Sequence, residues 1–335
     1  MVAWRNRDKL ATAWLHCLPG PGGLNNPAFS EALALALCMP SPACKDRVGY
    51  SVGSSNRGAV VDLYGDKVQA AVMTGDHWRI RHDAVKLEIS SLCAWAKVEH
   101  TTEVFGLFSP VITAQALTRY ERGRQRQGLV PDFRIKTTNI TGASRHQLAE
   151  LKIISCSESW YAPSAGGKVR GTDKRANGLP ADYRRKARDV DREARAASGD
   201  QRGPVERKLE EYGDLLGLVF GVWGEASEGV HTLIEQLATS RLDSRQRTRG
   251  RPGNKQELGL IRAQIHRRLS LAAVKAQVEC LLSRLHQVGP GSKAMQQRRE
   301  WEARENEMMK REQQAQWLRK IEGIQTLRKG AILTA

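Results

Sequence analysis

The chain has 335 residues, 40% of them hydrophobic, so it is long enough to bury a sizeable core in two domains or in one domain with appendages. Lysines and arginines number 53 against 36 aspartates and glutamates, and the formal net charge of +17 at pH 7 favours a polyanionic partner such as nucleic acid. No apolar run is long enough to cross a bilayer, so an integral membrane protein is excluded and no membrane partner is expected.

The chain should begin with helices. Residues 7–19 show an amphipathic helical pattern, and a second helix is predicted over residues 26–38, with Pro27 in its first turn. Prolines, glycines and serines follow and indicate an irregular link. We therefore assign residues 1–58 to an N-terminal helical segment.

An α/β domain is predicted for residues 59–240. It should start with a short hairpin over residues 60–73, followed by a helix over residues 77–96 that carries an apolar stripe. A strand is predicted over residues 101–108, and a helical insertion over residues 109–128.

The stretch over residues 129–155 has the pattern of two strands joined by a turn. Apolar and charged residues alternate at both ends, and the middle is rich in turn residues. An antiparallel hairpin centred on residue 141 would bring Asp132 and Glu150 together at its open end. Because side chains alternate along a strand, Glu150 and Lys152 should point to the same face.

Four further elements should follow the hairpin: a charged helix, an amphipathic helix, the most apolar strand of the chain and another helix. Their expected ranges are 180–197, 205–212, 216–223 and 227–239. A basic linker over residues 241–254 should lead to a helical C-terminal extension over residues 255–335, whose first helix ends near residue 287. Its charged tail, residues 293–328, is either a solvated helix or a site of self-association through the C-terminal helices.

The paired acids of the predicted hairpin have a chemical use. Two neighbouring carboxylates repel each other unless a positive charge lies between them, and a hard divalent cation suits such oxygen ligands. Mg²⁺ or Mn²⁺ held by Asp132 and Glu150 would lower the pKa of a bound water and offset charge on a phosphate. Lys152 beside the metal could orient the attacking water.

Pro131-Asp132, followed by Glu150-Leu151-Lys152 on the next strand, resembles the PD-(D/E)XK signature of restriction-endonuclease-like nucleases. The resemblance implies an α/β fold with an αβββαβ core, in which helices flank a mixed sheet, between the N-terminal helical segment and long C-terminal helices. The predicted order helix, strand, strand, strand, helix, strand matches this core. The alternative is a surface hairpin with an incidental Glu–Lys pair.

In this superfamily a further acidic residue often comes from an upstream helix or strand. Glu103, on the predicted strand over residues 101–108, is the first candidate for that role, and Glu88 is the helical alternative. His77, and His82 with Asp83, rank below them, because a lone histidine on a helix is more often a packing or surface residue.

The sequence upstream of the hairpin is similar to the region before the restriction-like endonuclease of some non-LTR retrotransposon proteins. A cysteine/histidine zinc knuckle occurs in that region. The similar stretches lie between Ala11 and Lys86. Cys44 is present, but Asp66 and Ala71 stand where the knuckle would need His and Cys, so we predict no zinc.

A basic stretch over residues 168–195 follows the candidate site directly. Ten basic residues outnumber five acidic ones there, which favours contacts with phosphates. The alternative is a solvated helix with internal ion pairs. The residues expected to bind nucleic acid are Lys174, Arg175, Tyr183, Arg184 and Lys186.

The leading prediction is a metal-dependent DNA endonuclease of mobile-element origin, with DNA, or alternatively RNA, as the partner. Asp132, Glu150, Lys152 and Glu103 are its predicted catalytic residues, and Asp132 and Glu150 its metal ligands. The second hypothesis is a catalytically inactive nucleic-acid-binding protein that keeps the nuclease fold, and the third a helical scaffold working through residues 255–328. Six cysteines without CxxC spacing indicate reduced thiols and a nuclear or cytoplasmic location.

Overall fold

The computed structural model shows a mixed α/β fold, which confirms the expected class. Among the described residues the chain forms eight α-helices, two short 3-10 helices and a four-stranded mixed sheet. No helix of these residues is long and apolar enough to cross a membrane. The described residues are 8–17, 23–52, 60–71, 73, 75, 77–113, 129–138, 144–155, 161, 169–194, 201–250, 253–288 and 307.

Contacts divide the chain into two compact units. The first comprises residues 1–23 and 82–274 and contains the whole sheet, and the second comprises residues 24–81 and 275–335. Helices α5 (His77–Ala96) and α11 (Lys255–Leu285) each run from one unit into the other. Both helices lie close to their predicted ranges. All of the predicted catalytic residues belong to the first unit.

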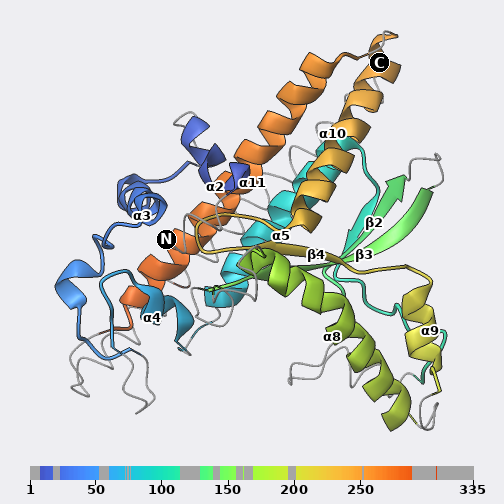
Figure 1. The fold of residues 1–335 in the computed structure, drawn as a ribbon, viewed down its shortest axis with the longest axis horizontal. Coiled ribbons are helices and arrows are strands. Elements are labelled where there is room, and N and C mark those ends of the chain that lie inside the picture. The colour runs from blue at the N-terminus through green and yellow to red at the C-terminus, as the bar shows by residue number, and fades with distance from the viewer. Residues whose placement is uncertain are drawn as a thin grey trace. The chain divides into compact units, whose positions relative to one another are not determined.

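The sheet has the strand order β1-β2-β3-β4 and combines both strand directions (Figure 1). β1 (His100–Thr102) pairs antiparallel with β2 (Phe133–Thr138), and β2 pairs antiparallel with β3 (Ser144–Ile153). β4 (Leu216–Phe220) pairs parallel with β3, so a crossover connection must join these two strands.

The β2–β3 hairpin has the predicted register. Phe133 pairs with Ala149, and every further pair up to Thr138 with Ser144 is centred on residue 141. The predicted turn itself, residues 139–143, lies outside the described residues. This register places Asp132 and Glu150 next to the Phe133–Ala149 pair, at the open end of the hairpin.

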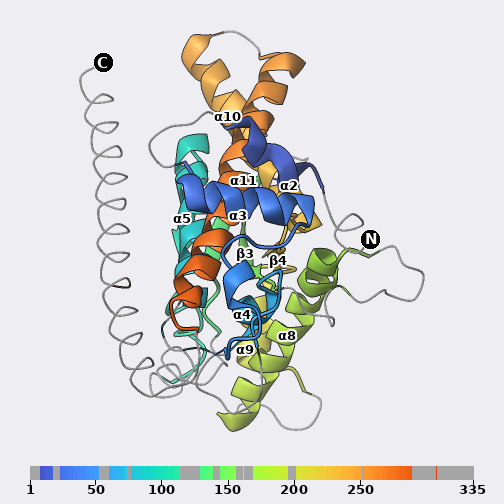
Figure 2. The ribbon, with the colours of Figure 1, turned by 90° about the vertical axis from the view of Figure 1, so that its left-hand side faces the viewer.

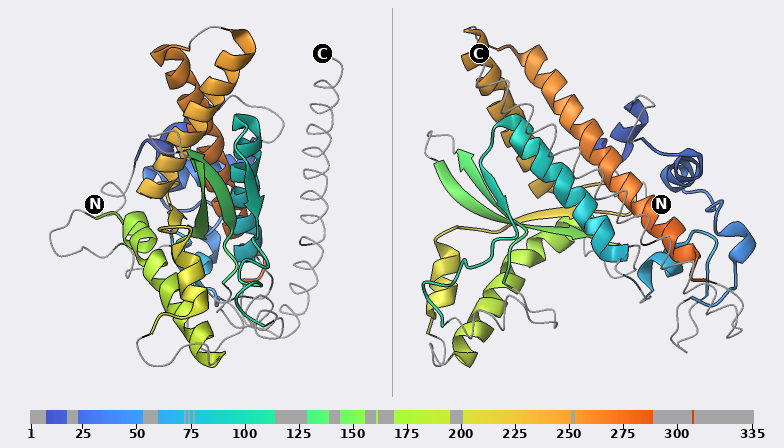
Figure 3. Two further views of the ribbon diagram at one scale, coloured as in Figure 1. Left: turned by 90° about the vertical axis from the view of Figure 1, so that its right-hand side faces the viewer. Right: turned by 180° about the vertical axis from the view of Figure 1, so that it is seen from behind.

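Helices cover both faces of the sheet. In the left view of Figure 3 the strands lie between α5 on one side and α8 (Gly171–Glu193) and α10 (Glu228–Arg249) on the other. Tyr183 of α8 bonds to Glu150, so the residues that alternate with Glu150 must face α5. Three of them are at most 2% exposed: Phe133, Ile135 and Leu151.

The crossover begins earlier than the sequence predicts. Helix α8 starts at Gly171, and Pro180, the predicted start, lies inside it. The first turns are held by packing, since Thr172 and Leu179 are almost fully buried. The next helix, α9 (Pro204–Glu210), agrees with its prediction.

Gly217 of β4 allows α8 to approach the sheet closely. A Cβ on Gly217 would lie 2.8 Å from Cβ of Ala176 and 3.0 Å from its carbonyl oxygen. We expect Gly217→Val to lower the free energy of unfolding by about 1–3 kcal/mol, measured by urea denaturation. Gly178 of the same helix has open space around it, and Gly178→Ala should raise this free energy by about 0.5–1 kcal/mol. A Gly217→Val variant as stable as the wild type would contradict the close packing.

Strand β1 ends at Thr102, whereas the sequence predicts a strand as far as residue 108. Glu103 has a φ of +49°, in the left-handed region that side-chain-bearing residues rarely adopt. Its N–H donates to the carbonyl of Asp132 at 2.9 Å. The chain therefore turns out of the extended conformation at this residue.

The predicted hairpin over residues 60–73 is wrong. Residues Asp66–Ala70 form helix α4, and Val60 forms an isolated bridge with Ser51. The carboxylate of Asp62 accepts the N–H of Lys67 and of two neighbouring residues, so it caps the start of α4.

Helix α10 continues to Arg249, so the linker predicted over residues 241–254 is helical in its first part. Arg241 lies over the ring of Trp95, 4.7 Å from its centroid, and Ser240 donates to the carbonyl of Ala96 at 3.0 Å. These contacts fix α10 to the end of α5.

The second unit contains α3 (Asn26–Leu37), α4 and the end of α11 (Figure 2). The side chain of Arg284 donates to main-chain carbonyls of α4, including Gln69 at 2.6 Å. Burial raises the pKa of Cys44, which belongs to the apolar core of this unit. The core residues are Cys44, Val52, Val61, Val68, Leu281, Leu285 and Val288.

The predicted helix over residues 7–19 is shorter in the structure. Helix α2 spans Lys9–Ala13 and a 3-10 turn, Trp14–His16, follows it. Residues 114–128 of the predicted insertion and residues 293–328 of the charged tail, Glu307 apart, lie outside the described residues.

Candidate active site

The predicted catalytic acids lie at the open end of the β2–β3 hairpin. Asp132 stands directly before β2, and its Oδ2 accepts the main-chain N–H of Leu151 at 2.9 Å. Glu150 lies beside that residue on β3 and is 6% exposed. Lys152 donates to Oε1 of Glu150 from the same face of the strand. The structure therefore brings Asp132, Glu150 and Lys152 together.

Tyr183 of α8 completes the surroundings of Glu150. Its hydroxyl donates to Oε2 of Glu150 at 2.5 Å, and the residue is 2% exposed. Burial and the charge of Glu150 raise the pKa of Tyr183 well above its usual value, so the hydroxyl stays protonated and donates. Tyr183 thus supports a carboxylate, which corrects the expectation that it contacts nucleic acid.

His82 of α5 reaches the carboxylate of Asp132 from the other side of the sheet. Its Nε2 lies 3.3 Å from Oδ2 of Asp132 and 3.3 Å from the carbonyl oxygen of Leu151. Its Nδ1 lies 3.1 Å from Oδ1 of Asp83. All three partners are acceptors, so only the doubly protonated ring donates on both sides.

The charge of His82 has a clear physical cause. Burial disfavours the charged ring, but the hydrogen bonds to Asp132 and Asp83 outweigh burial and raise the pKa of His82 to about 9. His82 is therefore a cation at neutral pH, held against Asp132.

Asp132 is correspondingly kept as a carboxylate. Burial alone would raise its pKa, but the hydrogen bond and the charge of His82 lower it below the usual value. The charge of Lys152 and the N–H of Leu151 act in the same direction. An anionic oxygen in a nearly buried place is what a bound cation requires.

The carboxylate of Glu103 is linked to that of Asp132 only through other side chains. Its carboxylate accepts a hydrogen bond from Nζ of Lys86 at 2.6 Å, and Lys86 also lies 3.2 Å from Oδ1 of Asp83. Asp83 in turn holds His82. The carboxylate of Glu103 is therefore the outer, half-exposed end of a charge network that leads into the site, although its main-chain N–H bonds directly to the Asp132 carbonyl.

The other candidates from the sequence lie elsewhere. Glu88 is ion-paired with Arg268 at 2.6 Å. His77 belongs to the second unit, where its Nε2 lies 3.2 Å from Nε2 of Gln287. Neither residue is part of the network around Asp132.

Lys186 of α8 lies close to Glu150, and Arg175 of the same helix lies close to Lys186. Nζ of Lys186 is 5.3 Å from the centroid of the Tyr183 ring. Burial lowers the pKa of Lys186, as do the neighbouring charges of Lys152 and Arg175, while Glu150 acts in the opposite direction. Lys186 thus lies beside the catalytic candidates.

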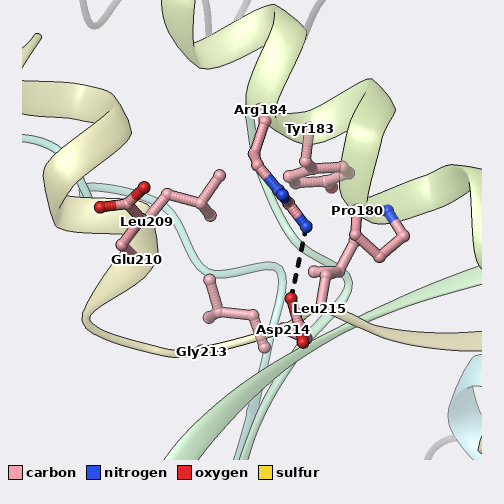
Figure 4. A pocket seen from close by; sticks show the side chains of 9 residues that line it. Pro180, Tyr183, Arg184, Leu209, Glu210, Gly213, Asp214 and Leu215 are labelled. Atoms are coloured by element: carbon pink, nitrogen blue, oxygen red, sulfur yellow. Dashed lines mark hydrogen bonds and ion pairs between the residues drawn. The ribbon is translucent and has the colours of Figure 1, made fainter. Parts of the chain in front are cut away.

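The remaining basic residues of α8 are mostly paired. Lys174 is exposed. Arg184 pairs with Asp214 at 3.4 Å beside a pocket of about 240 Å³ formed by α8, α9 and the residues before β4 (Figure 4). The ion pairs of the α8 arginines are Arg175–Asp182, Arg184–Asp214, Arg185–Asp182, Arg188–Glu206 and Arg192–Asp189.

The oxygen ligands at the hairpin fit a hard divalent cation. Oδ2 of Asp132 and the carbonyl oxygen of Leu151 already converge on one N–H group of His82. Glu150 adds a second carboxylate. Among the described residues no group of three or more His, Cys, Asp or Glu side chains is arranged to hold a metal. Mg²⁺ does not require one, because it keeps several waters and takes one or two carboxylates.

Comparison with protein-family models, with curated proteins and with solved structures finds no match for this chain. The geometry of the hairpin, α5 and α8 therefore has to carry the functional inference. Of the residues in that geometry, Lys86 has no role in the sequence prediction. The sequence spacing could have indicated it, because residues 82 and 86 are one helical turn apart and lie on the same face of the helix.

Proposed function

We propose that the chain is a metal-dependent endonuclease that hydrolyses the phosphodiester backbone of DNA. The observation that carries the proposal is the convergence of Asp132, Glu150 and Lys152 at the open end of an antiparallel hairpin. Two carboxylates and one ammonium group that meet on a sheet suit cation-assisted hydrolysis of a phosphate ester.

The order of the elements supports a restriction-endonuclease-like core. Helix α5, strands β1, β2 and β3, the crossover helix α8 and strand β4 follow one another, with α9 added before β4. The sheet is mixed, and helices lie on both of its faces. This order agrees with the αβββαβ arrangement that the sequence resemblance implies and so supports the proposal, and a non-LTR retrotransposon protein is the origin that we propose.

Each residue has a defined part in the proposed reaction. Asp132 and Glu150 would hold Mg²⁺ or Mn²⁺, which when bound acidifies water and offsets charge on the phosphate. Lys152 would position the attacking water. The water oxygen forms a bond to phosphorus and gives a proton to solvent, the bond from phosphorus to the leaving sugar oxygen breaks, and that oxygen takes a proton from solvent. Tyr183 holds Glu150 in place.

The substrate would lie along the side of α8 that carries Lys186 and Arg175. Lys186 lies near Glu150 and Arg175 lies near Lys186, where they can contact the phosphates next to the one that reacts. The net charge of +17 would add long-range attraction for DNA, or alternatively RNA.

One observation favours a second function, that of an inactive nucleic-acid-binding protein with the same fold. Both oxygens of Glu150 are engaged by protein donors, Lys152 and Tyr183, and Asp132 is engaged by His82. Such internal neutralisation would let the site persist without a metal.

A cleavage assay separates the two functions. With Mg²⁺ or Mn²⁺ the wild type is expected to nick supercoiled plasmid, and Asp132→Ala should lower the rate by at least about 10²-fold because electrostatic stabilisation at the phosphate is lost. Asp214→Asn is the matched control, since this side chain is 88% exposed and lies outside the site. No cleavage by the wild type, with salt-sensitive DNA binding intact, would establish the inactive binding protein instead.

A further inference from the structure

One N–H group occupies the point where two oxygens of the proposed metal site meet. Nε2 of His82 is equally close, at 3.3 Å, to Oδ2 of Asp132 and to the carbonyl oxygen of Leu151. The opposite side of the ring is held by Asp83, which also pairs with Lys86. The His82 side chain is 17% exposed, so packing and these acceptors fix its position.

A divalent ion and this N–H group cannot use the same oxygens. Coordination would place Mg²⁺ about 2.0–2.1 Å from each ligand oxygen, in the space into which Nε2 of His82 points its proton. The N–H group presents the positive end of its dipole to the same two oxygens, so it excludes a cation from that point. Nε2 must therefore leave Asp132 and Leu151 before an ion can bind to both of them.

We propose that His82 is an internal competitor of the metal ion. Its ring holds Asp132 and the Leu151 carbonyl in the metal-free protein and moves away when the ion binds. The proposal rests on the proposed nuclease function. It adds to that function by identifying the His82 side chain as the group that occupies the metal site when no metal is bound. His82 keeps the acidic site compact without a metal, and it lowers the affinity for the metal by the cost of breaking its contacts.

The test is Mn²⁺ binding to the full chain without DNA, measured by isothermal titration calorimetry. His82→Ala should bind Mn²⁺ about tenfold more tightly than the wild type, because a charge-assisted hydrogen bond no longer has to be broken. His82→Gln, which keeps one donor without the charge, should fall between the two. His100→Ala is the matched control, because this half-buried histidine contacts Ser90 and the Val98 carbonyl and should leave the affinity unchanged.

Unchanged or weaker Mn²⁺ binding by His82→Ala would overturn the proposal, and weaker binding would make His82 a ligand or a positioning residue. A second readout does not depend on the folding of a variant. Mg²⁺ added to the wild type should shift the ring NMR signals of His82, and binding without such a shift would also overturn it.

The two proposals fail in distinguishable ways. If the wild type cleaves DNA and His82→Ala binds Mn²⁺ no more tightly, only the competitor role is wrong. If the wild type and His82→Ala neither bind Mn²⁺ nor cleave DNA, the nuclease function fails as well.

Discussion

Lys152→Ala is expected to lower the rate of metal-dependent DNA cleavage by about 10²–10⁴-fold without weakening Mn²⁺ binding. The reason is the position of the ammonium group. It donates to Oε1 of Glu150, yet the side chain is 36% exposed, so it can reach a water and a phosphate that arrive from solvent. A role in the reaction, and not in holding the metal, follows from this position.

Plasmid cleavage and calorimetric Mn²⁺ binding together check this prediction. Lys136→Ala is the matched control, because Lys136 lies on the same hairpin, is 44% exposed and pairs with Glu99 away from the site. Lys152→Arg keeps the charge but replaces the compact ammonium group with a larger planar group whose donors lie elsewhere, so it should restore the phosphate contact and only a minor part of the rate. A Lys152→Ala variant that cleaves at the wild-type rate would remove Lys152 from the mechanism.

The centre of the candidate site could be predicted because it is built from one local element. Alternation along two short strands and a turn centred on residue 141 specify the pairing, and the pairing specifies that Asp132 and Glu150 meet. No knowledge of the rest of the chain is needed. The long helices α5 and α11 were predictable for a similar reason, since each carries a long apolar stripe.

The residues that hold the catalytic acids in place could not be predicted in the same way, because they come from segments that are distant in the sequence. His82 approaches Asp132 from a helix fifty residues earlier in the chain, and no local pattern reports that contact. Tyr183 is different. Its burial could have been foreseen, because it falls every fourth residue in a stripe with Leu179 and Ala187, and all three are at most 2% exposed.

The elements that differ from prediction are those where a tertiary contact decides the local conformation. The start of α8 is poor in strong helix formers, and its first turns depend on the close approach of Ala176 to Gly217. The end of α10 is polar, but Arg241 stacks on Trp95 and extends the helix. Propensity alone favours a loop or a linker in both places.

Glu225→Gln is expected to remove a pH dependence of stability worth about 3 kcal/mol between pH 4.5 and pH 7. Glu225 lies in the turn between β4 and α10 and is fully buried. Its Oε1 accepts the hydroxyl of Tyr161 at 2.7 Å, and its Oε2 accepts the N–H of Trp223 at 2.9 Å. Burial nevertheless raises its pKa to about 7, because these two hydrogen bonds do not make up for lost hydration.

The sign follows from the two pKa values of Glu225. Its pKa is about 7 in the folded chain against an ordinary value of 4.5, so the folded state binds the proton more tightly. The free energy of unfolding should therefore be highest, as far as this group is concerned, below pH 4.5. It should fall as the pH rises towards 7 and level off above that. A neutral glutamine has no such term, so the stability of Glu225→Gln relative to the wild type should increase over the same interval.

Urea denaturation at a series of pH values from 4.5 to 8 measures this difference directly. Glu225→Gln also loses a hydrogen-bond acceptor, which lowers its free energy of unfolding by the same amount at every pH. This constant offset does not affect the change of the difference with pH. Glu228→Gln is the control, because this side chain is 79% exposed and its replacement should shift the curve without changing its slope. Parallel curves for Glu225→Gln and the wild type would mean that Glu225 is already ionised at pH 5. The turn before α10 would then hold a buried negative charge.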